Sequence, residues 1–234
     1  GPNDSTFKSF FSAANFLAYA NNLIVVRTDA TGYKNATQSG STGVKIKNKD
    51  HYDTAFADLN TTTYGMFAAK YPGTLGNGIQ ILVVDNAVWT WAFNSDQDAD
   101  AGALTIRGIF PIAPTTSAQA AALGLENDEV HIAVLDNSIG TWTGLAGSVL
   151  EKFEFLSKIN GVVKSDGTNS YWATAIANTS KYLWPIASPA AAMTSNDSGA
   201  NWKQNINTIA SDAVLQAIDT ANYAITLAHG ANDF

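Results

Sequence analysis

The sequence predicts an α+β fold with a β-rich core, a mixed sheet or sandwich, flanked by short α-helices. Three observations lead to this prediction. Short β-branched or apolar runs recur along the chain, turn residues separate them, and the helical segments between them follow no strict β-α-β alternation. The last observation argues against a doubly wound parallel sheet. Because no internal repeat is present, we expect residues 1–234 to form mainly one domain.

The N-terminal residues 6–21 are predicted to form a core helix. Apolar residues recur there at spacings of three and four, which places them on one helical face. They are Phe7, Phe10, Phe11, Ala14, Leu17 and Ala18. The β-branched run 23–26 follows at once and is predicted as a buried strand. Residues 28–49 are polar with little periodicity, so we expect a long loop or a reduced insertion.

The next elements alternate between short helices, strands and turns. Residues 50–59 are predicted as a helix capped by Asp50. The segment 67–85, FAAKYPGTLGNGIQILVVD, is predicted as a strand, a Pro-Gly turn and a second strand at 79–84. Residues 85–102 are expected to form an acidic loop that contains tryptophans, and 104–112 another strand. Ser117 is expected to cap a short helix that ends near Leu123.

Residues 129–186 show the most regular pattern. The pattern predicts a hairpin with a wide loop. Its strands are expected at 130–135 and 148–157, with a turn at 137–140 and a glycine-rich bend between them. A turn at Asp166-Gly167, a helix at 169–178 and a strand at 181–186 follow. Beyond a linker-like segment at 187–200, we expect a last helix at 211–223 and a last strand at 224–228.

Composition limits the classes of function. The formal net charge of −7 argues against a surface that follows nucleic-acid phosphates, and no apolar run is long enough to span a membrane. The absence of cysteine excludes disulfides and thiolate chemistry. Gly1-Pro2 resembles the residue pair that a tag-removing protease leaves, so we expect a piece of a longer protein. Five glycosylation sequons carry little information without a secretory signal; they begin at Asn3, Asn35, Asn60, Asn178 and Asn196.

Asp96, Asp98 and Asp100 are candidate metal ligands, because their alternation resembles the start of a calcium loop. Glycine occupies the seventh place instead of the sixth, and Arg107 stands where a bidentate Glu is needed. We therefore predict a solvated acidic loop at 96–102 and no metal site, although the sequence leaves open whether this loop binds a cation.

Catalytic constellations are not indicated either. His51, His131 and His229 lie in separate elements, and His131, at the start of a strand, is predicted to be structural. The glycines of YPGTLGNG match no phosphate-binding pattern and are expected in turns. Of the carboxylates Glu151, Glu154 and Asp166, the first two lie three apart in a strand and should face opposite sides. We therefore predict that the protein has no catalytic residue, binds no cofactor and is not an enzyme.

Five segments together resemble the tail sheath proteins of contractile-tailed, myovirus-type bacteriophages. VHIAVLDNSIGTWTGLAGSVLEKFEFLSK with DGTNSYWATAIANTSKYLW matches a recurrent order of strand, glycine turns, Glu, and a Tyr-containing helix in that family. FFSAANFLAYANNLIVVR resembles its helix and strand near the N-terminal region. FAAKYPGTLGNGIQILV and ITLAHGAND resemble its Pro-Gly and Gly-Asn-Asp segments.

The resemblance implies a virion structural protein, located in the phage tail and assembled in the host bacterial cytoplasm. Sheath subunits stack helically around the tail tube and contract to drive it through the host envelope. The expected partners are other sheath copies, with the tube and baseplate contacted through parts outside these 234 residues. Because the family's C-terminal domain and terminal arms are absent, we expect this fragment to be monomeric.

A carbohydrate-binding or adhesin module is the alternative. Trp89, Trp91 and Trp142 lie in segments predicted as loops, where aromatic rings stack on sugars. The same tryptophans could instead fill a core or contact another subunit.

Overall fold

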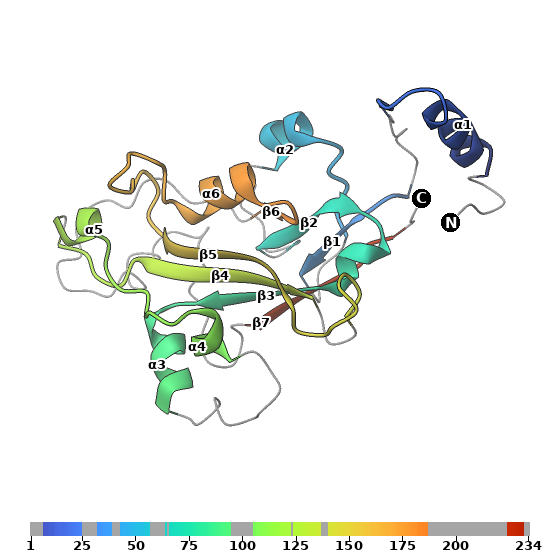
Figure 1. The fold of residues 1–234 in the computed structure, drawn as a ribbon. Coiled ribbons are helices and arrows are strands. Elements are labelled where there is room, and N and C mark those ends of the chain that lie inside the picture. Colours follow the sequence, from blue (N-terminus) through green and yellow to red (C-terminus); the bar gives the residue numbers. More distant parts are fainter. Residues whose placement is uncertain are drawn as a thin grey trace. The chain divides into compact units, whose positions relative to one another are not determined.

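The computed structural model describes residues 7–24, 32–38, 43–56, 64, 66–94, 105–122, 124–136, 140–186 and 224–231 (Figure 1). The chain divides into two compact units, Gly1–Gly32 together with Phe234, and Tyr33–Asp233. Of the predicted elements, the linker at 187–200 and the helix at 211–223 lie outside the described residues, as does the acidic loop at 96–102.

The first unit contains helix α1 (Phe7–Leu17), which confirms the helix predicted there but ends earlier. None of its residues is buried, and Phe7, Phe10 and Phe11 are each about half exposed. Within this unit, the helix therefore buries no apolar face, unlike the expected core helix. Leu23 and Ile24 lie in no strand. The rest of that predicted strand is outside the described residues.

The second unit is built on a seven-stranded sheet in the order β5-β4-β3-β7-β1-β2-β6. All paired strands are antiparallel. The strands are β1 (Asn35–Gln38), β2 (Phe67–Pro72), β3 (Ile79–Val84), β4 (Glu129–Asp136), β5 (Val149–Ser157), β6 (Leu183–Pro185) and β7 (Ala224–Ala228). With its short helices, this sheet confirms the α+β class.

Strand β7 occupies the middle of the sheet although it is the last strand in the chain. Its first part pairs with β3, with Ile225 opposite Ile81. Its last two residues pair with β1, with Leu227 opposite Gln38. Ile225 and Leu227 are buried whereas Ala224 and Thr226 are exposed, which is the alternation of a strand with one face on a core. One five-residue strand therefore joins two groups of three strands.

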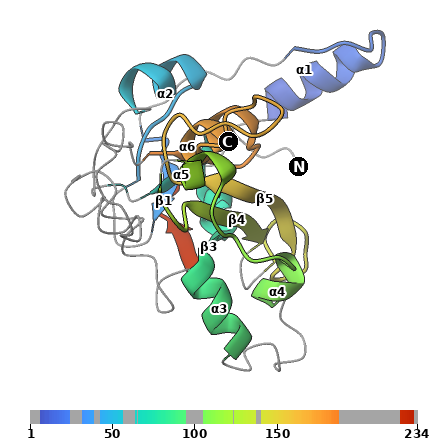
Figure 2. The same ribbon diagram turned by 90° about the vertical axis from the view of Figure 1, so that its left-hand side faces the viewer.

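The helices are short and lie on both sides of the strands. In Figures 1 and 2, α2 and α6 lie above the strands and α3 and α4 below them. They are α2 (Lys49–Ala55), α3 (Asn86–Asn94), α4 (Ile106–Ile109), α5 (Ala118–Ala122) and α6 (Trp172–Thr179), with the 3-10 helix η1 (Thr74–Gly78) between β2 and β3.

Strand β2 explains how two cores form. Phe67 and Ala69 belong to the main core, where Phe67 meets Trp172 of α6 edge to face at 5.6 Å between ring centroids. Ala68 points to the opposite face and joins a smaller core that includes Trp184 and Tyr52. Because both faces are covered, β2 begins with a continuous buried run instead of an alternating one.

Three sequence predictions fail in this unit. Residues 28–49, expected as a loop or reduced insertion, contain β1 and the first residue of α2. The polar residues of β1 do not mark a loop, because the fold buries most of them and satisfies their hydrogen bonds. The Asn35 carboxamide is buried, donates to the Ala69 carbonyl at 2.9 Å and accepts from Ile46 N–H at 2.9 Å. The expected loop after residue 85 begins with α3, and the strand expected at 104–112 contains α4 instead. Asp85 and Thr105 accept backbone hydrogen bonds at the starts of these two helices.

Most of the remaining predictions in the described part agree with the structure. Strands β2, β3, β6 and β7 and helix α6 lie where they were expected, and β4 with β5 forms the predicted hairpin. The Ser117 hydroxyl accepts from Ala120 N–H at the start of α5, as predicted. The cap of α2, however, is Asn48 and not Asp50.

We predict that Ile225→Ala lowers the free energy of unfolding by about 2–5 kcal/mol, because it leaves a cavity where β7 meets the core. Thr226→Ala, on the exposed face of the same strand, should change it by less than about 1 kcal/mol. Urea unfolding followed by tryptophan fluorescence measures both. Equal effects of the two substitutions would contradict the central position of β7.

Candidate functional site

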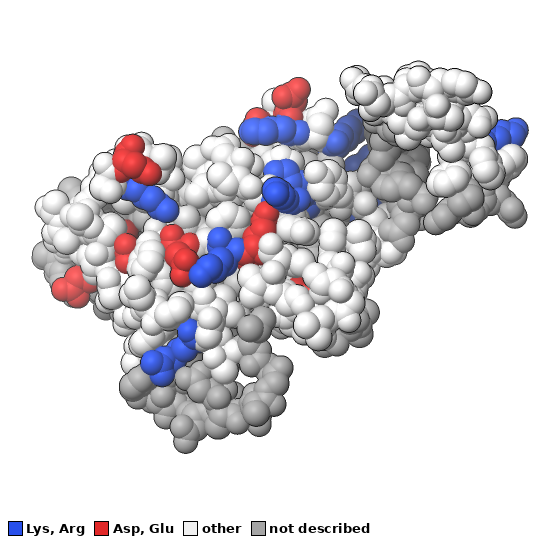
Figure 3. Space-filling model, viewed as in Figure 1, with Lys and Arg blue, Asp and Glu red and all other residues white. Residues whose placement is uncertain are grey.

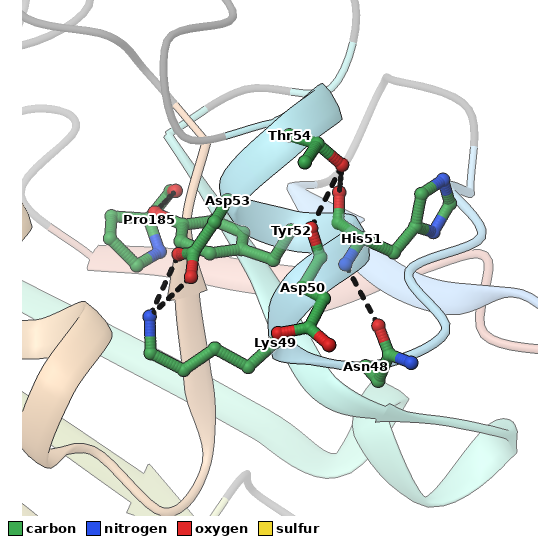
Figure 4. Close-up of polar contacts among 8 residues, drawn as sticks. All are labelled: Asn48, Lys49, Asp50, His51, Tyr52, Asp53, Thr54 and Pro185. Carbon is green, nitrogen blue, oxygen red and sulfur yellow. Dashed lines mark hydrogen bonds and ion pairs between the residues drawn. The ribbon is translucent and has the colours of Figure 1, made fainter.

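Helix α2 carries a group of neighbouring polar side chains, most of which stabilise the start of the helix (Figure 4). The Asn48 carboxamide accepts from His51 N–H at 2.8 Å and caps the helix. The His51 ring nitrogen Nδ1 accepts from Lys47 N–H at 3.2 Å. Lys49 and Asp53 form an exposed ion pair one turn apart, at 2.7 Å. These contacts stabilise the helix and assemble no catalytic group around His51.

Tyr52 anchors the same helix to the sheet. Its hydroxyl donates to the Pro185 carbonyl of β6 at 2.7 Å, and its ring stacks on Trp184 at 4.5 Å. The Lys70 ammonium lies 4.2 Å from the Trp184 ring centroid and donates to the Ser180 carbonyl. Burial lowers the pKa of Lys70, and the Glu151 carboxylate partly offsets this effect. The cluster binds α2, β2 and β6 together.

His131 is a structural residue, as its position at the start of a strand predicts. Its ring is buried between Phe110, stacked at 4.8 Å, and Phe155, edge to face at 4.7 Å. Nδ1 accepts from Phe155 N–H at 3.0 Å, so the proton lies on Nε2, which donates to the Ile112 carbonyl at 2.9 Å. Phe155 has a positive φ of 54° beside an irregularity in the β4–β5 register. One ring nitrogen therefore binds the backbone at this irregularity in β5, and the other binds the chain after α4. Both are engaged within the fold, so neither is left for a substrate.

Burial lowers the pKa of His131 below its ordinary 6.5, which keeps the ring neutral. The Ile112 carbonyl and the Glu154 carboxylate act in the opposite direction and are outweighed. A neutral ring is what the two hydrogen bonds require.

A polar cluster ties the chain segments at the β3–β5 end of the sheet. Lys158 and Asp85 form a buried ion pair at 3.4 Å, with side chains 3% and 8% exposed. Asp85 also caps α3 by accepting from Val88 N–H at 2.9 Å. Asp128 accepts from the hydroxyls of Ser117 and Ser157 at 2.9 and 2.6 Å. Sequence reasoning missed this cluster, because its members are widely separated and form no motif.

Asp136 organises the wide loop of the hairpin. Its carboxylate accepts from the backbone N–H groups of Trp142 and Thr143 and from the Thr143 hydroxyl, at 2.6 to 2.9 Å. Burial raises the pKa of Asp136, but these hydrogen bonds outweigh it, so the net shift is downward. An ionised Asp136 therefore holds the loop in place.

The carboxylates Glu151, Glu154 and Asp166, considered above as candidate catalytic groups, have separate structural roles. Glu151 accepts from the Ser180 hydroxyl and Lys181 N–H, both at 2.7 Å, and joins β5 to the start of β6. Glu154 pairs with Lys152 and lines an open groove of about 460 Å³ between β5 and α6. Asp166 holds its own turn: hydrogen bonds from Thr168 lower its pKa. Glu151 and Asp166 do not line the groove.

Two of the three tryptophans expected in loops, Trp89 and Trp142, are not arranged as a platform. Trp89 lies in α3 and its indole N–H donates to the Phe110 carbonyl at 2.9 Å. Trp142 is half-buried and meets Tyr182 edge to face at 5.2 Å. The side chain of Trp91 and the carboxylates Asp96, Asp98 and Asp100 lie outside the described residues.

The third histidine of the chain, His229, is exposed and has a positive φ of 67°.

Two segments far apart in the sequence meet at a clasp between η1 and the end of β7. The Asn77 carboxamide donates to the Gly230 carbonyl at 3.2 Å and accepts from Gly230 N–H at 2.7 Å. Lys34 and Ala231 exchange backbone hydrogen bonds of 3.2 and 3.3 Å beside it. A Cβ at Gly230 would lie 2.1 Å from the Gly73 carbonyl oxygen, so only glycine fits.

The surface and the candidate ligand groups give no further site in the described part. Lys and Arg lie beside Asp and Glu on the face in Figure 3, without a large area of one sign among those residues. No group of three or more His, Asp or Glu residues is placed to hold a metal there. Within the same ranges, no helix is long and apolar enough to cross a bilayer.

The described polar groups thus define a structural scaffold, in which buried ionisable side chains fasten one element to the next. No protein-family model matches the chain. The chain is 28% identical to the tail sheath protein of Salmonella phage ViI over an alignment that spans 288 positions. That alignment covers 92% of this chain and 45% of the phage protein, so the chain spans less than half of that relative's length. The match confirms the resemblance to tail sheath proteins seen in the sequence.

We predict that His131→Leu lowers the free energy of unfolding by about 1–3 kcal/mol, because the Ile112 carbonyl and Phe155 N–H lose their partner. It should also remove a pH dependence. Because the folded-state pKa of His131 lies below 6.5, the unfolded chain protonates first, and stability present above pH 6.5 is lost as the pH falls toward the folded-state value. Urea unfolding across this pH range, with His51→Leu as control, measures the effect. An unchanged profile in His131→Leu would contradict the structural role.

Lys158→Met is expected to destabilise the fold by about 3–5 kcal/mol, because it leaves the Asp85 carboxylate buried without its cation. Lys164→Met, at an exposed position, should change stability by less than about 0.5 kcal/mol. Thermal unfolding compares the two variants. If both melt alike, the buried ion pair does not contribute as described.

Proposed function

We propose that this chain is part of a tail sheath subunit, a structural protein of the virion of a contractile-tailed phage. In this proposal the subunit assembles helically around the tail tube with other copies of itself and contracts to drive the tube through the host envelope. The match over 92% of the chain to a phage tail sheath protein carries the proposal. The virion tail is the proposed location, with assembly in the host bacterial cytoplasm.

The clasp lies where two of the segments that carry the resemblance meet. The two segments that resemble the family's Pro-Gly and Gly-Asn-Asp segments, 67–83 and 225–233, contain Asn77 and Gly230, which bind each other in the fold. Their resemblance therefore falls on residues that depend on one another.

The ends of the second unit suggest how it fits into a larger subunit. Lys34 and Ala231 are hydrogen-bonded neighbours, so the chain enters and leaves this unit at one place. Adjacent ends are the arrangement that lets a domain be carried within a longer chain. In the proposed subunit, the rest of the polypeptide would contact the tail tube and baseplate from this point.

The proposed mechanism needs no catalytic residue. Contraction would exchange one set of subunit interfaces for another, with the free-energy difference between two packed states driving the change. Each subunit body must keep its shape during that exchange. The buried Asp85–Lys158 pair, the His131 contacts and the clasp supply fastenings suited to this demand. The carbohydrate-binding alternative gains no support from Trp89 or Trp142, whose rings are engaged within the fold.

We predict that the purified 234-residue chain is monomeric, whereas the longer subunit that contains it forms tubes. The reason is that the contacts between sheath copies are proposed to lie largely in the parts outside this chain. Size-exclusion chromatography with light scattering measures the mass, and negative-stain electron microscopy shows whether tubes form. Regular tubes from the 234-residue chain would refute the first part, and a longer subunit that forms none would refute the second.

A further inference from the structure

Two Asn-Gly dipeptides of this chain, Asn77-Gly78 and Asn160-Gly161, stand in opposite environments. Asn-Gly is the dipeptide most prone to spontaneous deamidation, because glycine has no side chain to hinder attack by its backbone nitrogen. The attack also requires that the Asn carboxamide and the following peptide can reorient. The fold permits this at one of the two positions and restrains it at the other.

Asn160 and Gly161 lie in an exposed turn that follows β5. Gly161 has a φ of +89°, as glycine has in the third position of a type II turn, and nothing within 4 Å surrounds its Cβ position. The Asn160 carboxamide has no hydrogen-bond partner among the described residues. Local opening of such a turn costs little free energy.

Asn77 is restrained by the clasp. Both ends of its carboxamide are engaged by Gly230, at 2.7 and 3.2 Å. Gly78 is buried, and a Cβ there would lie 2.5 Å from Thr141 Cβ, so the peptide that would have to rotate is packed against the hairpin loop. Reaction at Asn77 therefore requires that the clasp opens first.

We propose that Asn160 is a site of spontaneous modification in the folded protein, and that the same dipeptide at Asn77 is protected. The Gly161 nitrogen bonds to Asn160 Cγ, the carboxamide C–N bond breaks, and ammonia leaves with the proton given up by the attacking nitrogen. Water then opens the resulting succinimide at either carbonyl, which gives aspartate or isoaspartate. No oxidant, cofactor or enzyme takes part, and the inference does not depend on the proposed function.

The modification adds a negative charge, and isoaspartate adds a backbone atom, within a constrained segment. Ile159 and Val162 on either side are buried in one small cluster with Ala120 and Leu125. Just before them, Ile159 N–H donates to the Ser157 hydroxyl, which itself donates to Asp128. An extra backbone atom between two buried residues should loosen this cluster, so the isoaspartate form is expected to melt at a lower temperature.

The experiment incubates the folded 234-residue protein in warm, mildly alkaline buffer and follows both positions by tryptic peptide mapping. Trypsin releases Asn160 in the peptide 159–164 and Asn77 in the peptide 71–107. The expected result is conversion of Asn160 to an acid, with separate aspartate and isoaspartate peptides. Asn77 should convert at least about tenfold more slowly, the ratio that about 1.4 kcal/mol of additional opening free energy gives.

Two controls make the result decisive. In concentrated urea both positions should convert at similar rates, because the difference belongs to the fold. Asn160→Gln should not convert on the same timescale, and Asn160→Asp supplies the aspartate reference peptide. If Asn160 is stable in the folded protein while it converts in urea, or if Asn77 converts as fast as Asn160 without denaturant, the proposal is wrong.

Discussion

The fold depends on the double pairing of β7. This strand pairs with β3 on one side and β1 on the other, although more than a hundred residues separate it in the sequence from both. Without it, β5-β4-β3 and β1-β2-β6 would be two three-stranded groups, each with an exposed inner edge. Two inward residues, Ile225 and Leu227, bring this strand onto the main core. Within the sheet, the backbone pairing between the two groups therefore runs through these five residues.

Polar contacts at the margins of the sheet also hold its elements in one arrangement. Asp85 with Lys158 fastens the end of β3 to the end of β5, and Asn77 with Gly230 fastens η1 to the end of β7. Buried charges and amides are costly when unpaired, so such contacts favour one arrangement of the strands over others. A body with one preferred shape suits a subunit proposed to exchange its neighbours without changing its own fold.

The sequence predicted the elements whose pattern was local. The hairpin of β4 and β5, helix α6 and strand β7 follow from alternation, turn glycines and β-branched residues. Strand β1 was missed because its polar residues Asn35 and Thr37 are buried, a context that only the distant Ala69 and Ala228 create. Helix α3 was missed although Asp85 stood before it as a capping residue.

The prediction of function also succeeded where the sequence pattern was local and failed where distant residues meet. The order of five segments predicted the resemblance to tail sheath proteins, which the comparison with the phage ViI protein confirms. The structural role of His131 could be inferred from its place at the start of a strand. Its two hydrogen-bond partners, Ile112 and Phe155, could not. They come from separate elements, and the bulge that presents Phe155 N–H forms only when β4 and β5 pair.

Native-state hydrogen exchange, resolved by residue, tests the central claim that β7 makes the sheet one cooperative body. The account predicts that protected amides of β3, β7 and β1 exchange through the same opening, with the free energy of global unfolding. If the amides of β1, β2 and β6 exchange at a clearly lower free energy than those of β3 and β4, the two groups of strands open independently. That result would contradict the claim.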